Sequence, residues 1–509
     1  MIAKIPHPRA ASVCALFLVL VGAAAARSQE PVTTWHYDNS RDGANTNETI
    51  LTPLNVSSKT FGELFTQPVD GAIVGQALYL PQITIPGAGV HNIVYVATMN
   101  DSVYAFDADS ATGSNAAPLW HTSFLIDGAT PVPIKLQGCA GGTDWTQVGI
   151  VSTMVIDPVA GRLYVVAKTY ENSEFVYRLH VLAVATGLEE SVSPIVISGS
   201  YVVGGETYVF APKMEVNRPA LMLENGFLYI AFGSNGCRSD SEEGWVMSYE
   251  ASTLQPTGVF DDEPGESAAA IWMSGGGLSS DSSGNIYGAT ADGPFASGLN
   301  FGQSVFKLSQ GGGTLELADW FTPFNELYLD DHDKDLFAPV LVLPTQTGTY
   351  PNLLAAVGKE GTIYILNQKS LGHFCASCTI VDSNVVQELQ NAAPFTGALA
   401  YWNNTIYTSA TGSSISAWLL TNGVLATTPF AKSGKVDSGH SPVISANGTT
   451  SGILWQLTGS SISAFNATTL KRLYISQKLP TLPHFANLVV AHGKVYVGTN
   501  TSLAVYGLL

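Results

Sequence analysis

The chain has 509 residues, a formal net charge of −18 at pH 7 and only 12% charged residues. Such an acidic chain lacks the basic surface that phosphate backbones and anionic lipids attract, which argues against nucleic acid or a membrane surface as partner. Fifty glycines and few charges are typical of short strands joined by tight turns, so the composition favours an all-β fold.

The N-terminus has the pattern of an export signal. Lys4 and Arg9 precede an apolar stretch at 10–21, and small residues follow at 24–26. The apolar stretch is too short to span a bilayer, which disfavours the alternative of a membrane anchor. We therefore expect a cleaved signal peptide over 1–26 and a secreted or periplasmic protein with no membrane span.

A two-strand unit recurs eight times after residue 90. In each unit an apolar strand is followed by a polar turn and a second apolar strand. The first strands lie at 93–97, 163–167, 228–232, 286–290, 353–357, 406–410, 453–457 and 495–499, and the second at 103–106, 179–184, 246–249, 305–308, 362–365, 415–418, 462–465 and 503–506. A short repeat of this kind, without intervening helices, predicts a β-propeller.

The two ends of the repeat array predict how the ring closes. The last unit, 486–509, supplies three strands and lacks an outer one, whereas 61–67 has the pattern of an outer strand without its own blade. Pairing the two would remove two exposed sheet edges. We predict one domain over 61–509, a single eight-bladed propeller of four-stranded antiparallel blades whose last blade is closed by an N-terminal strand. The N-terminal extension covers 27–60, and its polar residues 30–60 are expected to wrap the outside or a rim.

The best repeat unit resembles a known family. Residues 94–120 read VYVATMNDSVYAFDADSATGSNAAPLW and are similar to the quinoprotein, or pyrroloquinoline-quinone (PQQ), repeat, with weaker similarity at 179–187 and 462–474. The resemblance implies a propeller like that of the quinoprotein alcohol dehydrogenases, which hold PQQ and calcium at the propeller axis. Propellers of this kind include both enzymes and scaffolds, so the resemblance is more specific for fold than for function.

The resemblance also implies a set of site residues. Glu174, in an E-F-x-x-R pattern, and Asn235, in the turn after a strand, match calcium ligands, with Asp331 as a third. Asp331 or Asp333 matches the catalytic base, and Lys359 matches a quinone-contacting lysine. Carboxylate and amide oxygens suit Ca²⁺, and a carboxylate can take the alcohol proton. Each match also has a structural interpretation as an ordinary turn or loop residue.

Two departures from the dehydrogenase pattern concern the walls of the quinone site. The chain has no two adjacent cysteines, and no tryptophan lies between Glu174 and Asn235. A flat cofactor would lose both faces of its slot. Arg218, at the start of a predicted inner strand, is a further cofactor- or ligand-binding candidate, because arginine is rarely buried without a partner. An interblade salt bridge is the alternative.

Four of the five cysteines lie outside the signal. Cys375 and Cys378 form a CxxC, for which a disulfide that pins a loop is favoured over a redox or metal site. Cys139 and Cys237 then form the remaining candidate pair.

Two functions stay open. One is a binding propeller for a small-molecule or glycan ligand or an extracellular protein. The other is a PQQ- and calcium-dependent alcohol or sugar dehydrogenase. They are distinguished by whether Glu174, Asn235, Asp331 (or Asp333) and Lys359 converge on one axial pocket.

Overall fold

The chain forms an eight-bladed all-β propeller. The computed structural model describes residues 1–3, 30–138, 145–234, 243–266, 268, 270–311, 314–390, 397–410, 412–436 and 440–509. Residues 4–26 of the expected signal peptide and the expected Cys139–Cys237 pair lie outside these residues. No helix within them is long and apolar enough to cross a membrane.

Each blade is an antiparallel sheet whose strands follow one another in the sequence. From the innermost strand outward, blades 1 to 4 consist of β3 (Leu78–Ile85), β4 (Gly89–Thr98), β5 (Ser102–Asp107) and β6 (Trp120–Ser123); β9 (Val155–Asp157), β10 (Arg162–Glu171), β11 (Glu174–Ala183) and β12 (Ile195–Val196); β16 (Met222–Glu224), β17 (Phe227–Ser234), β18 (Trp245–Glu250) and β19 (Pro256–Asp261); and β20 (Ser279–Ser280), β21 (Ile286–Ala289), β24 (Val305–Gly311) and β25 (Thr314–Thr322).

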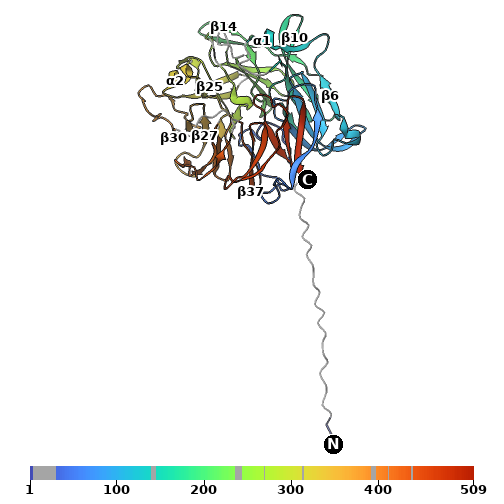
Figure 1. Ribbon diagram of the computed structural model, residues 1–509. Coiled ribbons are helices and arrows are strands. Elements are labelled where there is room, and N and C mark those ends of the chain that lie inside the picture. Colours follow the sequence, from blue (N-terminus) through green and yellow to red (C-terminus); the bar gives the residue numbers. More distant parts are fainter. Residues whose placement is uncertain are drawn as a thin grey trace.

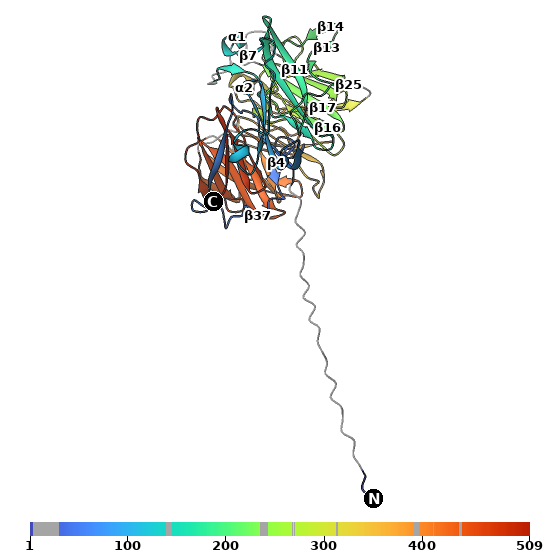
Figure 2. The ribbon, with the colours of Figure 1, turned by 90° about the vertical axis from the view of Figure 1, so that its right-hand side faces the viewer.

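Blades 5 to 8 repeat the pattern, except that the outermost strand of blade 8 comes from the N-terminal part of the chain. They consist of β26 (Leu341–Val342), β27 (Leu353–Val357), β28 (Ile363–Asn367) and β30 (Gln387–Leu389); β31 (Ala400–Trp402), β32 (Thr405–Ser409), β33 (Ser414–Thr421) and β35 (Ala431–Lys435); β36 (Val443–Asn447), β37 (Thr450–Thr458), β38 (Ser461–Asn466) and β39 (Arg472–Ile475); and β40 (Leu488–Ala491), β41 (Lys494–Gly498), β42 (Ser502–Leu508) and β2 (Phe61–Pro68). Figure 1 shows the blue β2 beside the red strands of blade 8, and Figure 2 places β11 and β17 on the opposite side of the molecule from β37.

Short elements decorate this frame. They are β1 (Ala44–Asn45), β7 (Thr130–Pro133), β8 (Gln147–Val148), β13 (Ser200–Val203), β14 (Glu206–Val209), β15 (Glu215–Val216), β22 (Phe295–Ala296), β23 (Asn300–Phe301), β29 (His373–Phe374), β34 (Val424–Leu425), α1 (Ile134–Gln137) and α2 (Glu326–Asp331). The Cys375–Cys378 disulfide is present, and it directly follows β29, which pairs with β25 of blade 4. The disulfide therefore sits in a loop that fastens blade 5 to blade 4.

The core is divided among the eight seams between neighbouring blades. Within the described residues, each seam has its own cluster of buried apolar side chains. On β4, Ile93 and Tyr95 face blade 2, whereas Val94 and Val96 face blade 8. Because successive side chains alternate between faces and both faces are buried, these strands are apolar at nearly every position.

The tyrosine of the repeat ties one blade to the next. In four blades the hydroxyl of the second-strand tyrosine donates to a backbone carbonyl of the following blade. The pairs are Tyr95 with Val184 (3.1 Å), Tyr164 with Ala251 (3.0 Å), Tyr407 with Ala467 (3.1 Å) and Tyr496 with Ala108 (3.4 Å). The aromatic position of the repeat thus has a polar function as well as an apolar one.

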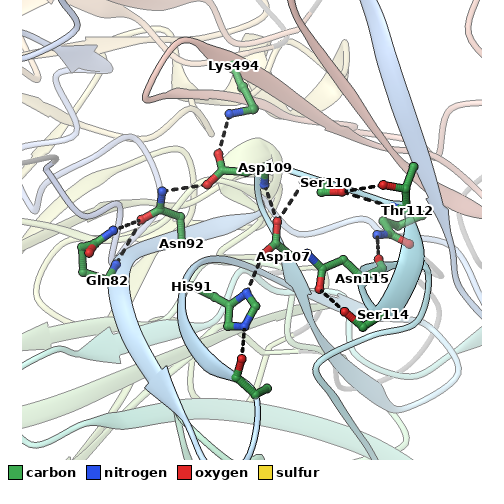
Figure 3. A network of polar contacts seen from close by, with 12 residues as sticks. Gln82, His91, Asn92, Asp107, Asp109, Ser110, Thr112, Ser114, Asn115 and Lys494 are labelled. Carbon is green, nitrogen blue, oxygen red and sulfur yellow. Dashed lines mark hydrogen bonds and ion pairs between the residues drawn. The ribbon is translucent and has the colours of Figure 1, made fainter.

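The ring closes as the sequence predicts. β2 pairs with β42 in an antiparallel register, with Phe61 opposite Leu508. A polar network reinforces the seam between blades 1 and 8 (Figure 3). In it, Nζ of Lys494 forms an ion pair with Oδ1 of Asp109 at 2.7 Å. The neighbouring Asp107 accepts the backbone N–H of Asp109 at 2.8 Å, so the aspartates of the best repeat unit hold both the turn and the seam.

The N-terminal extension does not take the peripheral course expected from the sequence. Trp35 and Arg41 are 0% and 1% exposed, and the stretch around them lies against the innermost strands of the blades. Polar composition suggested solvent exposure, but these polar groups are used in hydrogen bonds to the propeller interior.

Candidate functional site

The candidate site is formed by loops that lead into the innermost strands. Because all blades present these loops at the same end of the axis, residues distant in the sequence meet there. The loops carry Arg218 before β16, Trp272 before β20, Phe337 before β26 and Phe485 before β40. We call the site that they form the channel mouth.

Arg218 lies at the centre of the channel mouth and is 5% exposed. Its guanidinium carbon is 4.3 Å from the ring centroid of Trp272, 4.6 Å from that of Phe485 and 4.9 Å from that of Trp145. Burial lowers the pKa of Arg218 to about 9, so the side chain remains protonated at neutral pH. Within the described residues no carboxylate pairs with it, which leaves a buried cation compensated only by aromatic rings.

A second charged group lies beside these rings. Lys359 forms ion pairs with Asp333 and Asp335, and its ammonium is 5.3 Å from the ring centroid of Phe337. Trp272 packs against the small apolar cluster that contains Phe337. Trp272 and Phe337 therefore connect the aromatic surroundings of Arg218 with the Lys359 group.

Three aspartates form the acidic part of the channel mouth. Asp292, Asp333 and Asp335 each offer a carboxylate oxygen, and these oxygens lie within 4.8 Å of one another. Gln303 donates a hydrogen bond of 3.1 Å to Asp335, which is 4% exposed. Asp292 comes from the loop after β21, whereas Asp333 and Asp335 follow α2, so the group joins blades 4 and 5.

The electrostatics of the group are set by burial and by Lys359. Burial alone would raise the pKa of Asp335, but a hydrogen bond with Asp292 and the charge of Lys359 hold it below its ordinary value. Burial would lower the pKa of Lys359, but Asp335 and Asp333 hold it above its ordinary value. A hydrogen bond between two carboxyl groups requires a shared proton, and a cation could take the place of that proton.

The structure places the predicted residues in different parts of the molecule. Arg218, Asp333 and Lys359 lie at the channel mouth. Glu174 begins β11, is exposed and pairs with Glu171 at the tip of a long hairpin of blade 2. Asp331 ends α2 and is also exposed. Asn235 lies outside the described residues.

Sequence reasoning missed several residues of the site. Asp292 lies in an Ala-Asp-Gly turn that carries no distinctive signal. Phe485 could have been found, because it precedes its inner strand as Trp272 does. Trp145 comes from the loop before β8, outside the repeat, and only tertiary structure brings it to Arg218.

Comparisons with solved structures bear on this architecture. The chain is similar to a quinohemoprotein alcohol dehydrogenase from Comamonas testosteroni, with a TM-score of 0.61, 14% identity and coverage of 95% of this chain and 81% of that one. It is similar to another from Pseudomonas putida HK5 (TM-score 0.62, 12% identity, 94% and 80% covered) and to a europium-containing methanol dehydrogenase (TM-score 0.62, 12% identity, 94% and 98% covered). The fold is that of the quinoprotein dehydrogenases. No protein family and no curated protein matches the sequence.

The residues at the channel mouth fit a metal ion. Asp292, Asp333 and Asp335 offer the hard oxygen donors that Ca²⁺ and related cations prefer. Lys359 already supplies one positive charge to two of them, so a metal would share these carboxylates with the ammonium or displace it.

The same residues do not fit a quinone stacked on the aromatic rings. A flat cofactor needs open ring faces on which to lie. At the channel mouth the guanidinium of Arg218 covers Trp145, Trp272 and Phe485, at 4.3 to 4.9 Å from their centroids. The sequence also lacks two adjacent cysteines, so the described residues of the channel mouth do not form the stacked slot that a flat quinone needs.

Proposed function

We propose that this protein is an extracytoplasmic binding propeller whose channel mouth takes a small carboxylate-bearing ligand. The observation that carries the proposal is Arg218, a buried cation with three aromatic walls and no carboxylate partner in the described residues. A buried charge gains strongly from an anionic hydrogen-bond partner, and a planar guanidinium suits a carboxylate in two-point contact.

The surroundings of Arg218 restrict the ligand further. The aromatic rings make the surroundings of Arg218 apolar, which suits a ligand whose carboxylate is attached to an apolar body. The neighbouring aspartates disfavour a ligand with several negative charges, whereas Lys359 is occupied by its own ion pairs. A monocarboxylate or a uronic acid residue of a glycan is therefore a better match than a polyanion.

The test is a ligand titration that follows thermal stability. A panel of monocarboxylates and acidic sugars should contain compounds that raise the melting temperature. At a ligand concentration of a hundred times Kd, such a compound should stabilise the folded protein by about 2.7 kcal/mol. Arg218→Met should lose this response, since charged hydrogen bonds contribute about 1.5–3 kcal/mol, or roughly tenfold to a hundredfold in affinity. The exposed Arg472 provides the matched control, Arg472→Met, which should respond like the wild type. A response unchanged in Arg218→Met would refute the proposal.

The Asp292, Asp333 and Asp335 group supports a second candidate, a calcium-dependent alcohol or sugar dehydrogenase. Asp292 and Asp335 would hold the cation, which would supply positive charge at the channel mouth, and Asp333, which pairs with Lys359, would be the candidate base. Addition of Ca²⁺ and PQQ with dye-linked alcohol oxidation tests this candidate. Turnover that is abolished in Asp333→Asn and Lys359→Met would favour the enzyme over the binding propeller.

A further inference from the structure

The axis of the propeller is occupied by the N-terminal segment 32–48, which we call the hub segment. Trp35 and His36 are 0% and 1% exposed, and their rings stack at 3.6 Å with an interplanar angle of 4°. Arg41 is 1% exposed. Such burial of a polar, nonrepetitive segment shows that it is enclosed by the blades.

The hub segment makes hydrogen bonds to all eight blades, in the order in which the blades follow around the ring. The contacts are Val32 with Tyr79 of blade 1 (2.8 Å), Thr33 with Ile156 of blade 2 (2.8 Å), Asn39 with Leu223 of blade 3 (2.8 Å) and Ser280 of blade 4 (2.8 Å), Ser40 with Val342 of blade 5 (2.9 Å), Asp42 with Tyr401 of blade 6 (2.7 Å), Gly43 with Ile444 of blade 7 (2.7 Å), and Asn45 with Val490 of blade 8 (3.1 Å). The segment therefore makes one circuit around the axis.

These contacts use the free inner edges of the blades. The innermost strand of a blade has a neighbour on one side only, so its other edge presents unpaired N–H and C=O groups to the axis. In blades 4 to 7 the inner strand donates an N–H to a carbonyl of the hub segment, and β1 continues as a parallel partner of β36. This is recognition of a peptide backbone by strand edges, the chemistry of β-augmentation.

Side chains of the hub segment are held as specifically as its backbone. Arg41 donates from Nε to the carbonyl of Leu278 at 2.8 Å and from Nη1 to the carbonyl of Trp35 at 2.7 Å. A β-carbon on Gly277 would approach Nη2 of Arg41 to 3.0 Å, and one on Gly276 would approach the Trp35 ring to 2.7 Å. The two glycines thus leave the space that Trp35 and Arg41 fill.

The backbone of the hub segment is shaped by its surroundings. His36 and Arg41 have φ angles of 55° and 62°, in the left-handed region that such residues seldom adopt on their own. A conformation that is locally unfavourable persists where external contacts impose it. The contacts to the blades and the Arg41 side chain supply that constraint.

We propose that the axis of this propeller is a peptide-binding site and that the hub segment occupies it as a tethered ligand. The ligand class is an extended peptide recognised through its backbone by the inner edges of the blades, with Trp35 and Arg41 as side-chain anchors. The tether is the connection 49–60, whose Leu51 and Val56 are buried in the seam between blades 7 and 8; after it the chain enters β2 as the outer strand of blade 8.

The bound peptide also forms the floor under the channel mouth. Trp35 packs against Ala220, close after Arg218, and donates from Nε1 to Asn487 at 3.3 Å, close after Phe485. The hub segment therefore lies directly beside the residues that follow Arg218 and Phe485 in the sequence.

Cutting the tether of the folded, full-length protein tests the proposal. A protease site inserted between the exposed Ser58 and Lys59 allows cleavage after folding, while β2 keeps the ring closed. After cleavage, the N-terminal fragment should remain bound in native mass spectrometry and exchange slowly with an isotope-labelled synthetic peptide of the same sequence. Arg41→Met and Trp35→Phe should each release the fragment at least tenfold faster, whereas Leu54→Ala, at a side chain 98% exposed, should leave the rate unchanged.

Two results would overturn the proposal. Immediate loss of the wild-type fragment from a propeller that keeps its circular dichroism spectrum would show that only the covalent tether holds the segment in place. Unfolding of the propeller on cleavage would show that the segment is part of the core rather than a ligand. Neither readout depends on the identity of the ligand at Arg218.

Discussion

Removal of one aromatic ring from the closing strand is a quantitative test of ring closure. Phe61, in β2, is 1% exposed and belongs to the seam between blades 7 and 8. Its ring centroid lies 5.0 Å from that of Tyr474 and 5.2 Å from that of Trp455. Both are strand residues of blade 7, so the Phe61 side chain joins the closing strand β2 to a blade more than 380 residues later in the sequence.

Phe61→Ala should lower the free energy of unfolding by about 3–5 kcal/mol, the range for burial of a phenylalanine plus the cavity left behind. Aromatic pairs contribute roughly 0.5–1.5 kcal/mol within that total. Because the entropy of unfolding is about 2 cal/mol/K per residue, the melting temperature of a chain of this length should fall by about 3–5 °C. In a propeller of this size, a small shift in melting temperature thus corresponds to a large change in the free energy of unfolding.

Urea denaturation followed by tryptophan fluorescence measures this effect, with Trp455 as a reporter beside the mutated position. The control is Phe430→Ala, which removes the same ring where it is 52% exposed and should cost less than about 1 kcal/mol. If the two variants lose the same free energy of unfolding, packing of β2 against blade 7 does not stabilise the closed propeller.

Two further predictions concern polar contacts. Tyr164→Phe removes the hydrogen bond to Ala251 and should lower the free energy of unfolding, measured by urea denaturation, by about 0.5–1.5 kcal/mol. The control Tyr350→Phe, at a residue 44% exposed, should leave this free energy unchanged. Equal losses in the two variants would contradict the role of the hydrogen bond between the blades. The pKa of Asp335 is held below its ordinary value, so its stabilisation is present above about pH 4 and is lost as pH falls through the depressed value. Lys359→Met removes the charge that depresses the pKa of Asp335, so melting temperatures should show a larger loss at pH 7 than at pH 4. A loss independent of pH would show that Lys359 acts only by packing.

The sequence was sufficient to predict the blades. Strands such as 93–97 and 495–499 are apolar on both faces, and polar turns separate them at every repeat, so the local pattern locates each strand. The ends differ, because pairing extends 93–97 to β4, Gly89–Thr98. The closing strand was also predictable. The strand at 61–67 has no blade of its own and blade 8 lacks an outer strand, so pairing the two satisfies the unpaired edges of both.

The candidate site was only partly predictable. A motif within one stretch of chain related Lys359 to Asp331, with Asp333 as the alternative; Asp331 is exposed at the end of α2, whereas Asp333 pairs with Lys359. Glu174 matched its motif equally well, yet the length of the hairpin that carries it places it in solvent, and hairpin length depends on pairing rather than on the motif.

Tertiary structure alone decided the contents of the axis. The contact of Arg218 with Phe485 and the hydrogen bond from Trp35 to Asn487 join residues that become neighbours only when the ring closes. No local periodicity encodes such contacts, because each depends on the summed geometry of all the blades between its partners. The sequence by itself therefore determined the repeating unit of this protein, whereas closure of the ring decided what lies at its centre.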